Sequence, residues 1–546
     1  MDFLTILILT ICTSFLYLYY SIKKAHLFFE KLKIPYLKPN LIFGNMTDVM
    51  LLRKSLAEAY RDQYNALEPH RFGGVFTMKK PVIIVRDPEL IRDIMIKDFA
   101  YFTDRGINTH KSIEPLSQHL FMLKGSTWRN LRIKLTTTFT SGKMKMMFPL
   151  LEKCGEKLTQ VIDNMSDERS FNAKDLFVRY TTDGIATCAF GLETNSLENP
   201  KSEFRAMASK AFEFRYKALL RTLWPSMPYS LVRFFNISLT DPQVQKFYLD
   251  IVDKTVTYRE QNDVTRNDFL DLLIALKNNT MMQKFHDTGD HEDLQKFLAQ
   301  IGHKTVKSDL EMTNDLLAAQ AFLFLAAGQD TTSTTLCYAL LELCLNPTIQ
   351  EKVRQEIHQV LADNDDTLTY DILKQFTYLE MVISGIYFYS PLHHSASSIT
   401  NIIPMPETLR KYPPAAMLFR HSKDNYKVPH SDVVIPANLS IIIPVFGLHM
   451  DEKYYDNPEE FRPERFTEQE IAKRPHFTYL PFGDGPRVCI AERFAMMNMK
   501  IGLVHALKDF SYRVSPEMKF PLQFEKNFGL LNPKDSVRLL RQRITT

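Results

Sequence analysis

The first pattern along the chain is an uncharged, apolar run from Phe3 to Tyr20 that is followed by two lysines. As a helix, its 18 residues measure roughly 27 Å, close to the hydrocarbon thickness of a bilayer. A cleaved signal peptide would place basic residues before the apolar run, whereas here Asp2 precedes it and the lysines follow it. The order predicts an uncleaved membrane anchor over residues 1–20, with its C-terminal flank in the cytosol.

After the anchor, Pro35 and Pro39 remove backbone donors and end helical patterning, so residues 21–40 are predicted to form a basic, proline-containing linker. Farther on, β-branched runs at Phe72–Met78 and Val82–Val85 predict a hairpin.

Helical patterning then begins, with Asp87 as the predicted N-cap before Pro88. Helical periodicity dominates to about residue 360, without internal repeats or a long polar linker. Two short strands closed by prolines are expected at 433–436 and 440–444. We therefore expect a mainly α fold with a small β region, forming a single large domain over residues 41–546.

One stretch, Gly385 to Pro406, breaks this pattern with three prolines and no helical periodicity. When these 22 residues are removed, four apolar residues fall at positions i, i+3, i+4 and i+8 of one amphipathic helix: Leu379, Val382, Ile383 and Leu409. We interpret the stretch as the translation of an unspliced intron. The alternative is a functional loop inserted inside that helix.

Charge and cysteine content exclude some classes of function. The chain has 67 basic and 63 acidic residues, a net charge of +4, which does not favour nucleic-acid binding. None of the six cysteines shows C-x-x-C spacing, so we expect a reducing, cytosol-facing compartment.

The stretch from Phe482 to Cys489 (FGDGPRVC) combines turn-forming residues with a cysteine, and helical composition resumes after it. Cys489 should therefore lie at or near a helix N-terminus, where the helix dipole stabilises a thiolate. A lone cysteine is usually a small buried hydrophobe, but this context favours a functional one. The stretch resembles the F-x-x-G-x-R-x-C-x-G haem loop of the cytochrome P450 family, matching at Phe482, Gly485, Arg487 and Cys489. Ala491 replaces the last glycine.

A second motif, Ala327 to Thr332 (AGQDTT), interrupts a long apolar helix and resembles the oxygen-binding groove of that family. The resemblance implies that Gly328 leaves room for a diatomic ligand, while Asp330 and Thr331 relay protons. The structural alternative for a mid-helix threonine is a bond to the carbonyl four residues earlier.

The resemblance also implies the cofactor, haem b (iron protoporphyrin IX), held by Cys489 and by groups at its propionates. The propionate residues are expected to be Trp128, Arg132, Arg420 and Arg487. Glu407-x-x-Arg410 resembles the family's structural pair, and Arg465 would complete its network.

The motifs imply a monooxygenase that inserts one oxygen atom from O2 into a lipophilic small molecule, a xenobiotic, plant toxin or endogenous lipid or hormone. Electrons would come from NADPH–cytochrome P450 reductase, with cytochrome b5 as a further candidate donor, at the endoplasmic reticulum membrane with the domain facing the cytosol. The segments expected to contact substrate are 108–123, 208–235, 322–326, 415–419 and 528–531. Asp104-Arg105-Gly106 is among the stretches most similar to insect microsomal members of the xenobiotic-metabolising group.

Two alternatives stay open. One is a haem-thiolate isomerase or dehydratase that needs no reductase. The other is a catalytically impaired haem protein, or a non-folding product, if residues 385–406 are present in the native protein.

Overall fold

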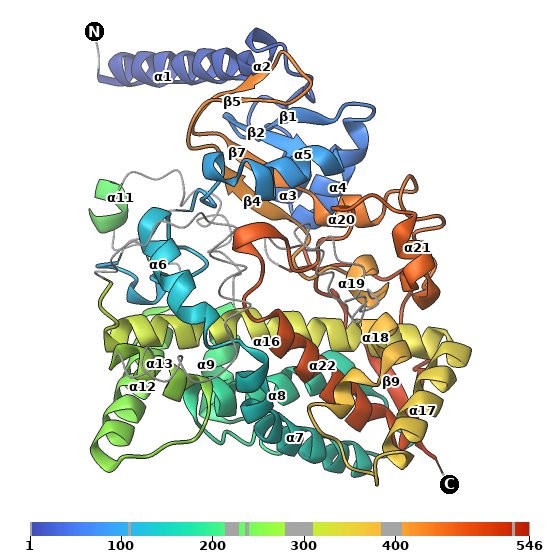
Figure 1. The fold of residues 1–546 in the computed structure, drawn as a ribbon. Coiled ribbons are helices and arrows are strands. Elements are labelled where there is room, and N and C mark those ends of the chain that lie inside the picture. The colour runs from blue at the N-terminus through green and yellow to red at the C-terminus, as the bar shows by residue number, and fades with distance from the viewer. Residues whose placement is uncertain are drawn as a thin grey trace, which may run out of the picture.

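The computed structural model describes most of the chain: residues 3–107, 111–212, 229–234, 238, 240–278, 310–383, 407–526 and 530–544. The described residues form a β-rich part near the N-terminus and a larger helical part (Figure 1). This arrangement confirms the expected mainly α fold with a small β region.

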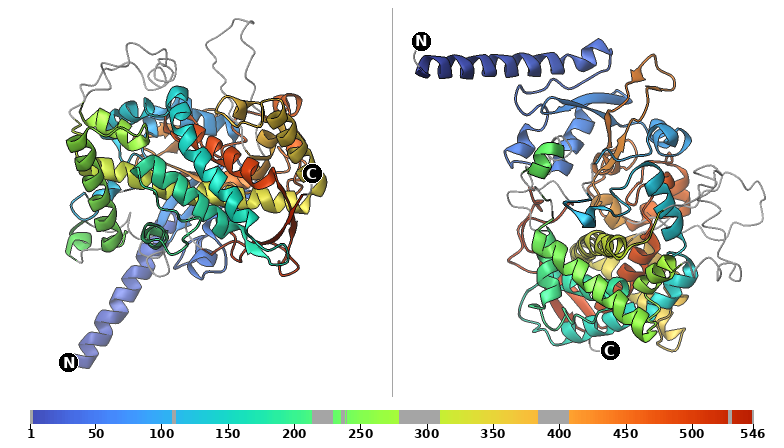
Figure 2. Two further views of the ribbon diagram at one scale, coloured as in Figure 1. Left: turned by 90° about the horizontal axis from the view of Figure 1, so that it is seen from below. Right: turned by 90° about the vertical axis from the view of Figure 1, so that its left-hand side faces the viewer.

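Helix α1 (Phe3–His26) projects away from the body of the protein (Figures 1 and 2). The run Phe3–Lys31 is long and apolar enough to cross a membrane, and its apolar window is not buried against the protein. The helix continues past Tyr20 into the predicted linker, because basic side chains suit a helix C-terminus and no proline occurs before Pro35.

The remainder of the predicted linker belongs to the folded body. Phe29, in α2 (Phe28–Lys31), is fully buried, and the ring of His26 lies 3.2 Å from the carbonyl oxygen of Met78. Beyond it, Gly74 N–H donates to the carbonyl of Pro35 at 2.8 Å. The end of the anchor is therefore held against the sheet.

The main sheet has the strand order β1 (Phe72–Thr77), β2 (Lys80–Val85), β7 (Ser440–Ile443) and β4 (Leu418–His421). β1 and β2 form the predicted hairpin, and the strand predicted near residue 440 pairs in parallel with β2. Helix α5 (Pro88–Arg92) follows, and Leu90 N–H donates to the carboxylate of Asp87 at 2.9 Å, which confirms the predicted cap.

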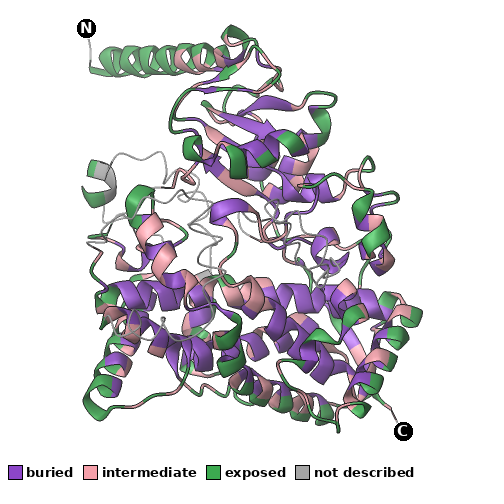
Figure 3. Ribbon diagram, viewed as in Figure 1, coloured by how far each residue is buried: buried purple, intermediate pink, exposed green. Residues whose placement is uncertain are grey.

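The helical part is built around α16 (Asn314–Leu345), a long helix whose residues are mostly buried (Figure 3). It packs against α8 (Ala173–Ile185), α12 (Pro242–Asn262) and α22 (Glu492–Leu507), and α7 (Ser141–Asp163) covers α22 and α8. The other helices are α3 (Thr47–Met50), α4 (Leu56–Ala66), α6 (Gly125–Thr136), α9 (Glu203–Phe212), α11 (Tyr229–Phe234), α13 (Phe269–Lys277), α17 (Pro347–Ala362), α20 (Val445–His449) and α21 (Glu468–Ala472). The other strands are β3 (Phe171–Asn172), β5 (Tyr426–Lys427), β6 (Val434–Ile435), β8 (Phe510–Val514) and β9 (Arg538–Arg543).

Two short helices flank the anomalous stretch, of which residues 384–406 lie outside the described part of the chain. α18 (Thr377–Ile383) ends before it and α19 (Glu407–Lys411) begins after it. The hydroxyl of Thr408 donates to the carbonyl oxygen of Val382 at 2.6 Å. Without residues 385–406, Thr408 would stand four residues after Val382, the spacing at which a helical threonine bonds a preceding carbonyl. The two helices therefore already meet in the register of one helix.

Candidate haem site

The loop before Cys489 has a backbone that its glycine makes possible. Gly485 has φ of +69°, and a Cβ atom there would lie 2.1 Å from the carbonyl oxygen of Met95. The turn returns the chain so that Cys489 N–H donates to the carbonyl of Phe482 at 3.0 Å. The helix expected after the cysteine, α22, begins at Glu492.

The side chain of Cys489 is accessible, whereas the loop residues Gly485 to Arg487 are buried, but the protein atoms around the Cys489 thiol still shield it from bulk water. Burial, with the nearby Glu492 carboxylate, raises the pKa of the Cys489 thiol to about 11. The Ala491 amide and the guanidinium groups of Arg132 and Arg105 act on this pKa in the opposite direction. Burial therefore outweighs the helix N-terminus in the protein alone, and a bound metal cation would supply the charge that deprotonates the thiol.

Arginines gather around this cysteine. Burial lowers the pKa of Arg132 and of Arg420 to about 10 and that of Arg487 to about 9. The pKa of Arg105 falls well below its usual range because of burial and the charges of these three neighbours. The guanidinium of Arg487 lies 3.8 Å from the centre of the Trp128 ring, so the expected tryptophan and arginine are together.

This arginine cluster (Arg105, Arg132, Arg420 and Arg487) holds more positive charge than its acidic neighbours Asp104 and Asp484 balance. Asp104 pairs with Arg487 at 3.2 Å, while the buried Nε of Arg420 has no hydrogen-bond partner. A buried group of cations of this kind fits a ligand with two carboxylates, as the propionates of haem provide. Arg105 was not among the predicted haem residues, and its only sequence signal was its place in Asp104-Arg105-Gly106.

The middle of α16 lies beside the first turn of α22, where Phe324 and Phe494 stack edge to face at 6.0 Å between ring centres. One turn farther along α16, Ala327 is exposed and Gly328 and Thr331 are partly exposed, although most of this helix is buried. This turn therefore leaves accessible atoms on a helix that is otherwise mostly buried.

The predicted oxygen-groove residues have contacts that the sequence did not reveal. The Thr331 hydroxyl donates to the carbonyl of Ala327 at 2.5 Å, which is the structural alternative for such a threonine. A Cβ on Gly328 would lie 2.9 Å from Cδ1 of Ile185. Gly328 therefore allows α8 to pack closely on α16, a role absent from the sequence prediction.

Asp330 is largely shielded from solvent and is held from two sides. Lys174 Nζ lies 2.5 Å from its Oδ1, and the Asn532 amide donates to its Oδ2 at 3.0 Å. Neither partner was predicted, because they lie far from Asp330 in the sequence.

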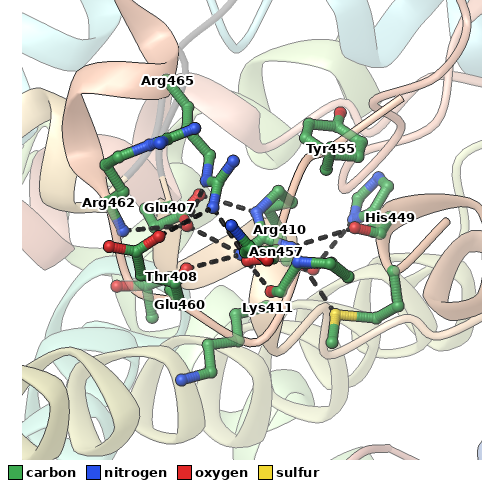
Figure 4. A network of polar contacts seen from close by, with 12 residues as sticks. Glu407, Thr408, Arg410, Lys411, His449, Tyr455, Asn457, Glu460, Arg462 and Arg465 are labelled. Atoms are coloured by element: carbon green, nitrogen blue, oxygen red, sulfur yellow. Dashed lines mark hydrogen bonds and ion pairs between the residues drawn. The ribbon is translucent and has the colours of Figure 1, made fainter. Parts of the chain in front are cut away.

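The predicted structural pair forms a buried network beside this site (Figure 4). Arg410 donates to both oxygens of Glu407 at 2.7 Å, and neither side chain is exposed. Arg410 also donates to the carbonyl of His449 at 3.0 Å, and Arg465 Nε lies 3.3 Å from Glu407. The network joins α19, α20 and the segment around residue 460.

An accessible cysteine beside arginines suited to two carboxylates, together with an accessible turn of a central helix, fits a haem-thiolate protein. The sequence model of the family described as Cytochrome P450 matches residues 34–386 and 405–541, so the chain belongs to the cytochrome P450 family. Residues 387–404, inside the anomalous stretch, are not matched.

Curated insect relatives cover nearly the whole chain. Cytochrome P450 6k1 of Blattella germanica is 35% identical over 96% of this chain and 94% of its own length. Probable cytochrome P450 6a13 of Drosophila melanogaster is 37% identical over 98% of both chains, and cytochrome P450 6a8 of the same species is 37% identical over 95% of both. The protein is a cytochrome P450 monooxygenase with haem as its cofactor.

Proposed function

We propose that this monooxygenase is anchored in the endoplasmic reticulum membrane by α1, faces the cytosol and oxidises a lipophilic small molecule with electrons from NADPH–cytochrome P450 reductase. The observation that carries the proposal is the accessible thiol of Cys489 beside Arg132 and Arg105 of the arginine cluster, just before α22, which packs against α16. Cytochrome b5 is a further candidate electron donor.

Haem bound through Cys489 would supply oxygen activation, because an anionic sulfur ligand promotes O–O cleavage. The chain's own residues hold the group and control protons around it. Arg105, Arg132, Arg420 and Arg487 would bind its propionates, while Glu407, Arg410 and Arg465 keep the surrounding segments in place. Thr331 and Asp330 would hold and pass protons at Oγ1 and at the carboxylate.

A lipophilic substrate is supported by the apolar side chains that remain accessible in the expected contact segments. Phe121 is 38% exposed, and Leu323, Ala326, Leu418 and Phe419 are partly exposed. Sites that bind such molecules are lined mainly by apolar and aromatic side chains with few polar groups. Parts of the expected segments, 108–110, 213–228, 235 and 528–529, lie outside the described residues.

The topology is supported by α1 and its basic C-terminal end. Protease treatment of sealed microsomes that contain the full chain tests it directly. We expect complete digestion of the domain without detergent, and a protected domain would place it in the lumen instead.

Reductase dependence tests the reaction. The full chain, reconstituted with reductase and NADPH, should convert a lipophilic ether or arene probe to an oxygenated product that contains one atom from labelled O2. Product formation from a lipid hydroperoxide, with no reductase and no NADPH, would favour the isomerase or dehydratase alternative. A preparation that binds haem but forms neither product would favour the impaired alternative.

A further inference from the structure

Asp330, Lys174, Thr334 and Asn532 form a closed polar ring, which we call the Asp330 ring. Its members come from three separate parts of the chain: α8, α16 and the C-terminal segment Leu530–Asn532. Lys174 Nζ lies 2.5 Å from Asp330 Oδ1 and also donates to the hydroxyl of Thr334. The Thr334 hydroxyl donates to Asn532 Oδ1 at 2.7 Å, and the Asn532 amide donates to Asp330 Oδ2 at 3.0 Å.

The ring uses both oxygens of the carboxylate. Asp330 and Lys174 side chains are each 18% exposed, so the ring is shielded but not sealed from water. The two bonds to the carboxylate differ in kind: one donor is a charged ammonium group, and the other is a neutral amide at a longer distance. Both bonds have a carboxylate as acceptor, so each is stronger than a bond between neutral groups, and together they fix the orientation of the carboxylate.

Asn532 also belongs to a segment with its own attachments. The Tyr338 hydroxyl, on α16, donates to the carbonyl of Leu531 at 3.0 Å, and Leu531 N–H donates to the carbonyl of Pro414 at 3.3 Å. Leu531 itself is buried. These attachments fix the place from which the Asn532 amide reaches the Asp330 carboxylate.

We propose that Asn532 is a positioning residue: its amide, together with Lys174, holds the Asp330 carboxylate in the orientation from which it accepts and passes a proton. The inference rests on the proposed proton role of Asp330.

Three variants of the full chain test the proposal: Asn532→Leu, which keeps the side-chain size and removes both amide bonds, Asp330→Asn and the matched control Tyr338→Phe. Tyr338→Phe loosens the same segment from the same helix but leaves the carboxylate bonds intact. The measurement is hydrogen peroxide released per NADPH consumed, with and without a lipophilic substrate.

We expect Asn532→Leu to raise this ratio by about tenfold, the size of one lost hydrogen bond to a charged group. Tyr338→Phe should leave the ratio nearly unchanged. Equal effects of the two variants would overturn the proposal, since the segment alone would then matter. An effect of Asp330→Asn with none from Asn532→Leu would also overturn it and leave the proton role standing, whereas no effect of Asp330→Asn would refute the proton role itself.

A second readout does not depend on turnover. Urea unfolding of the haem-loaded protein gives the free energy of unfolding. The losses of this free energy caused by Asn532→Leu and Asp330→Asn should not add in the double variant, because both substitutions remove the same bond. Additive changes would show that the two side chains do not interact in solution and would contradict the ring.

Discussion

At the residue scale, two opposing influences act on the pKa of the Cys489 thiol. Burial and the Glu492 carboxylate raise its pKa to about 11, while Arg132, Arg105 and the Ala491 amide favour the thiolate. A serine would keep the size of the side chain but would remove the soft, polarisable donor that binds iron in this class of site.

Cys489→Ser should therefore abolish the Soret shift that is diagnostic of thiolate ligation in the reduced, CO-bound protein. The measurement is a reduced CO difference spectrum of the full chain. Cys344→Ala is the matched control, because Cys344 is buried near the end of α16 and should leave the spectrum unchanged. Persistence of the shift in Cys489→Ser would contradict the assignment of this residue as the iron ligand.

Thr331→Ala should keep haem content and substrate affinity but lower product formation by about 10², the contribution typical of a positioned proton donor. Electrons from NADPH should appear as hydrogen peroxide instead. Thr335→Ala is the control one turn later, because its hydroxyl makes the same kind of bond, to the carbonyl of Thr331 at 2.9 Å, and is buried. If both variants behave alike, the role of Thr331 is structural.

Single residues differ in how far the sequence predicts them. Gly485 was predictable, because a positive φ beside a proline is a local property of the chain. The contact of Gly328 with Ile185 and the place of Arg105 in the arginine cluster were not, since both depend on which elements pack together. The motifs predicted which chemical groups the site contains. They did not predict which neighbours those groups contact in the fold.

At the scale of elements, His449 links α20 to the Glu407–Arg410 network. Leu480 N–H donates to its Nε2 at 2.8 Å, so Nδ1 carries the proton and donates to the carbonyl of Arg410 at 3.2 Å. Burial and the charge of Arg410 lower the pKa of His449 to about 3. The folded protein therefore keeps this imidazole neutral.

We expect acidic pH to destabilise the folded protein through protonation of His449. The unfolded chain binds a proton at His449 near pH 6.5 and the folded chain only near pH 3, so stability is complete above pH 6.5 and falls as the pH drops between these values. The slope should approach about 1.4 kcal/mol per pH unit. The free energy of unfolding in urea, measured as a function of pH, gives this slope. His449→Gln should reduce the slope below pH 6.5. The control is His358→Gln, on the exposed face of α17, which should leave the slope unchanged.

Deletion of residues 385–406 should leave haem content per protein at least as high as in the full chain and should raise the urea midpoint. The Thr408–Val382 bond shows that α18 and α19 already lie in the register of one helix. Removing the loop between them removes the entropy cost of closing that loop. The measurements are the pyridine haemochrome assay and urea unfolding of both versions. Loss of haem in the deletion variant would show that the stretch is a functional loop.

The elements themselves were largely predictable, because periodicity, prolines and caps are local signals: the hairpin at β1 and β2 and the Asp87 cap appear where expected. The end of the anchor was not predicted. The sequence places a linker after Tyr20, but Phe29 finds a buried site against the sheet, and a tertiary contact of this kind leaves no local signal.

At the scale of the whole molecule, the junction between α1 and the folded body separates two functions of the N-terminal region: membrane anchoring and support of the domain. Deletion of residues 2–22 should release the protein from membranes at high pH and leave the CO difference spectrum intact, because α1 is not buried against the domain. Deletion of residues 2–32 also removes Phe29, and a lost buried phenylalanine costs about 3–5 kcal/mol. The longer deletion should therefore reduce haem retention, and equal behaviour of the two would contradict a structural role for Phe29.

The arginine cluster has a consequence for the life of the protein in a cell. The guanidinium groups of the arginine cluster, three of them buried, repel one another, and a dianionic cofactor relieves that repulsion only in the folded state. Binding that favours the folded state raises stability, and a difference of 1–2 kcal/mol changes the steady-state abundance of a protein several-fold through quality-control proteases. The supply of porphyrin would thus set how much of this protein accumulates, and not merely how much of it is active.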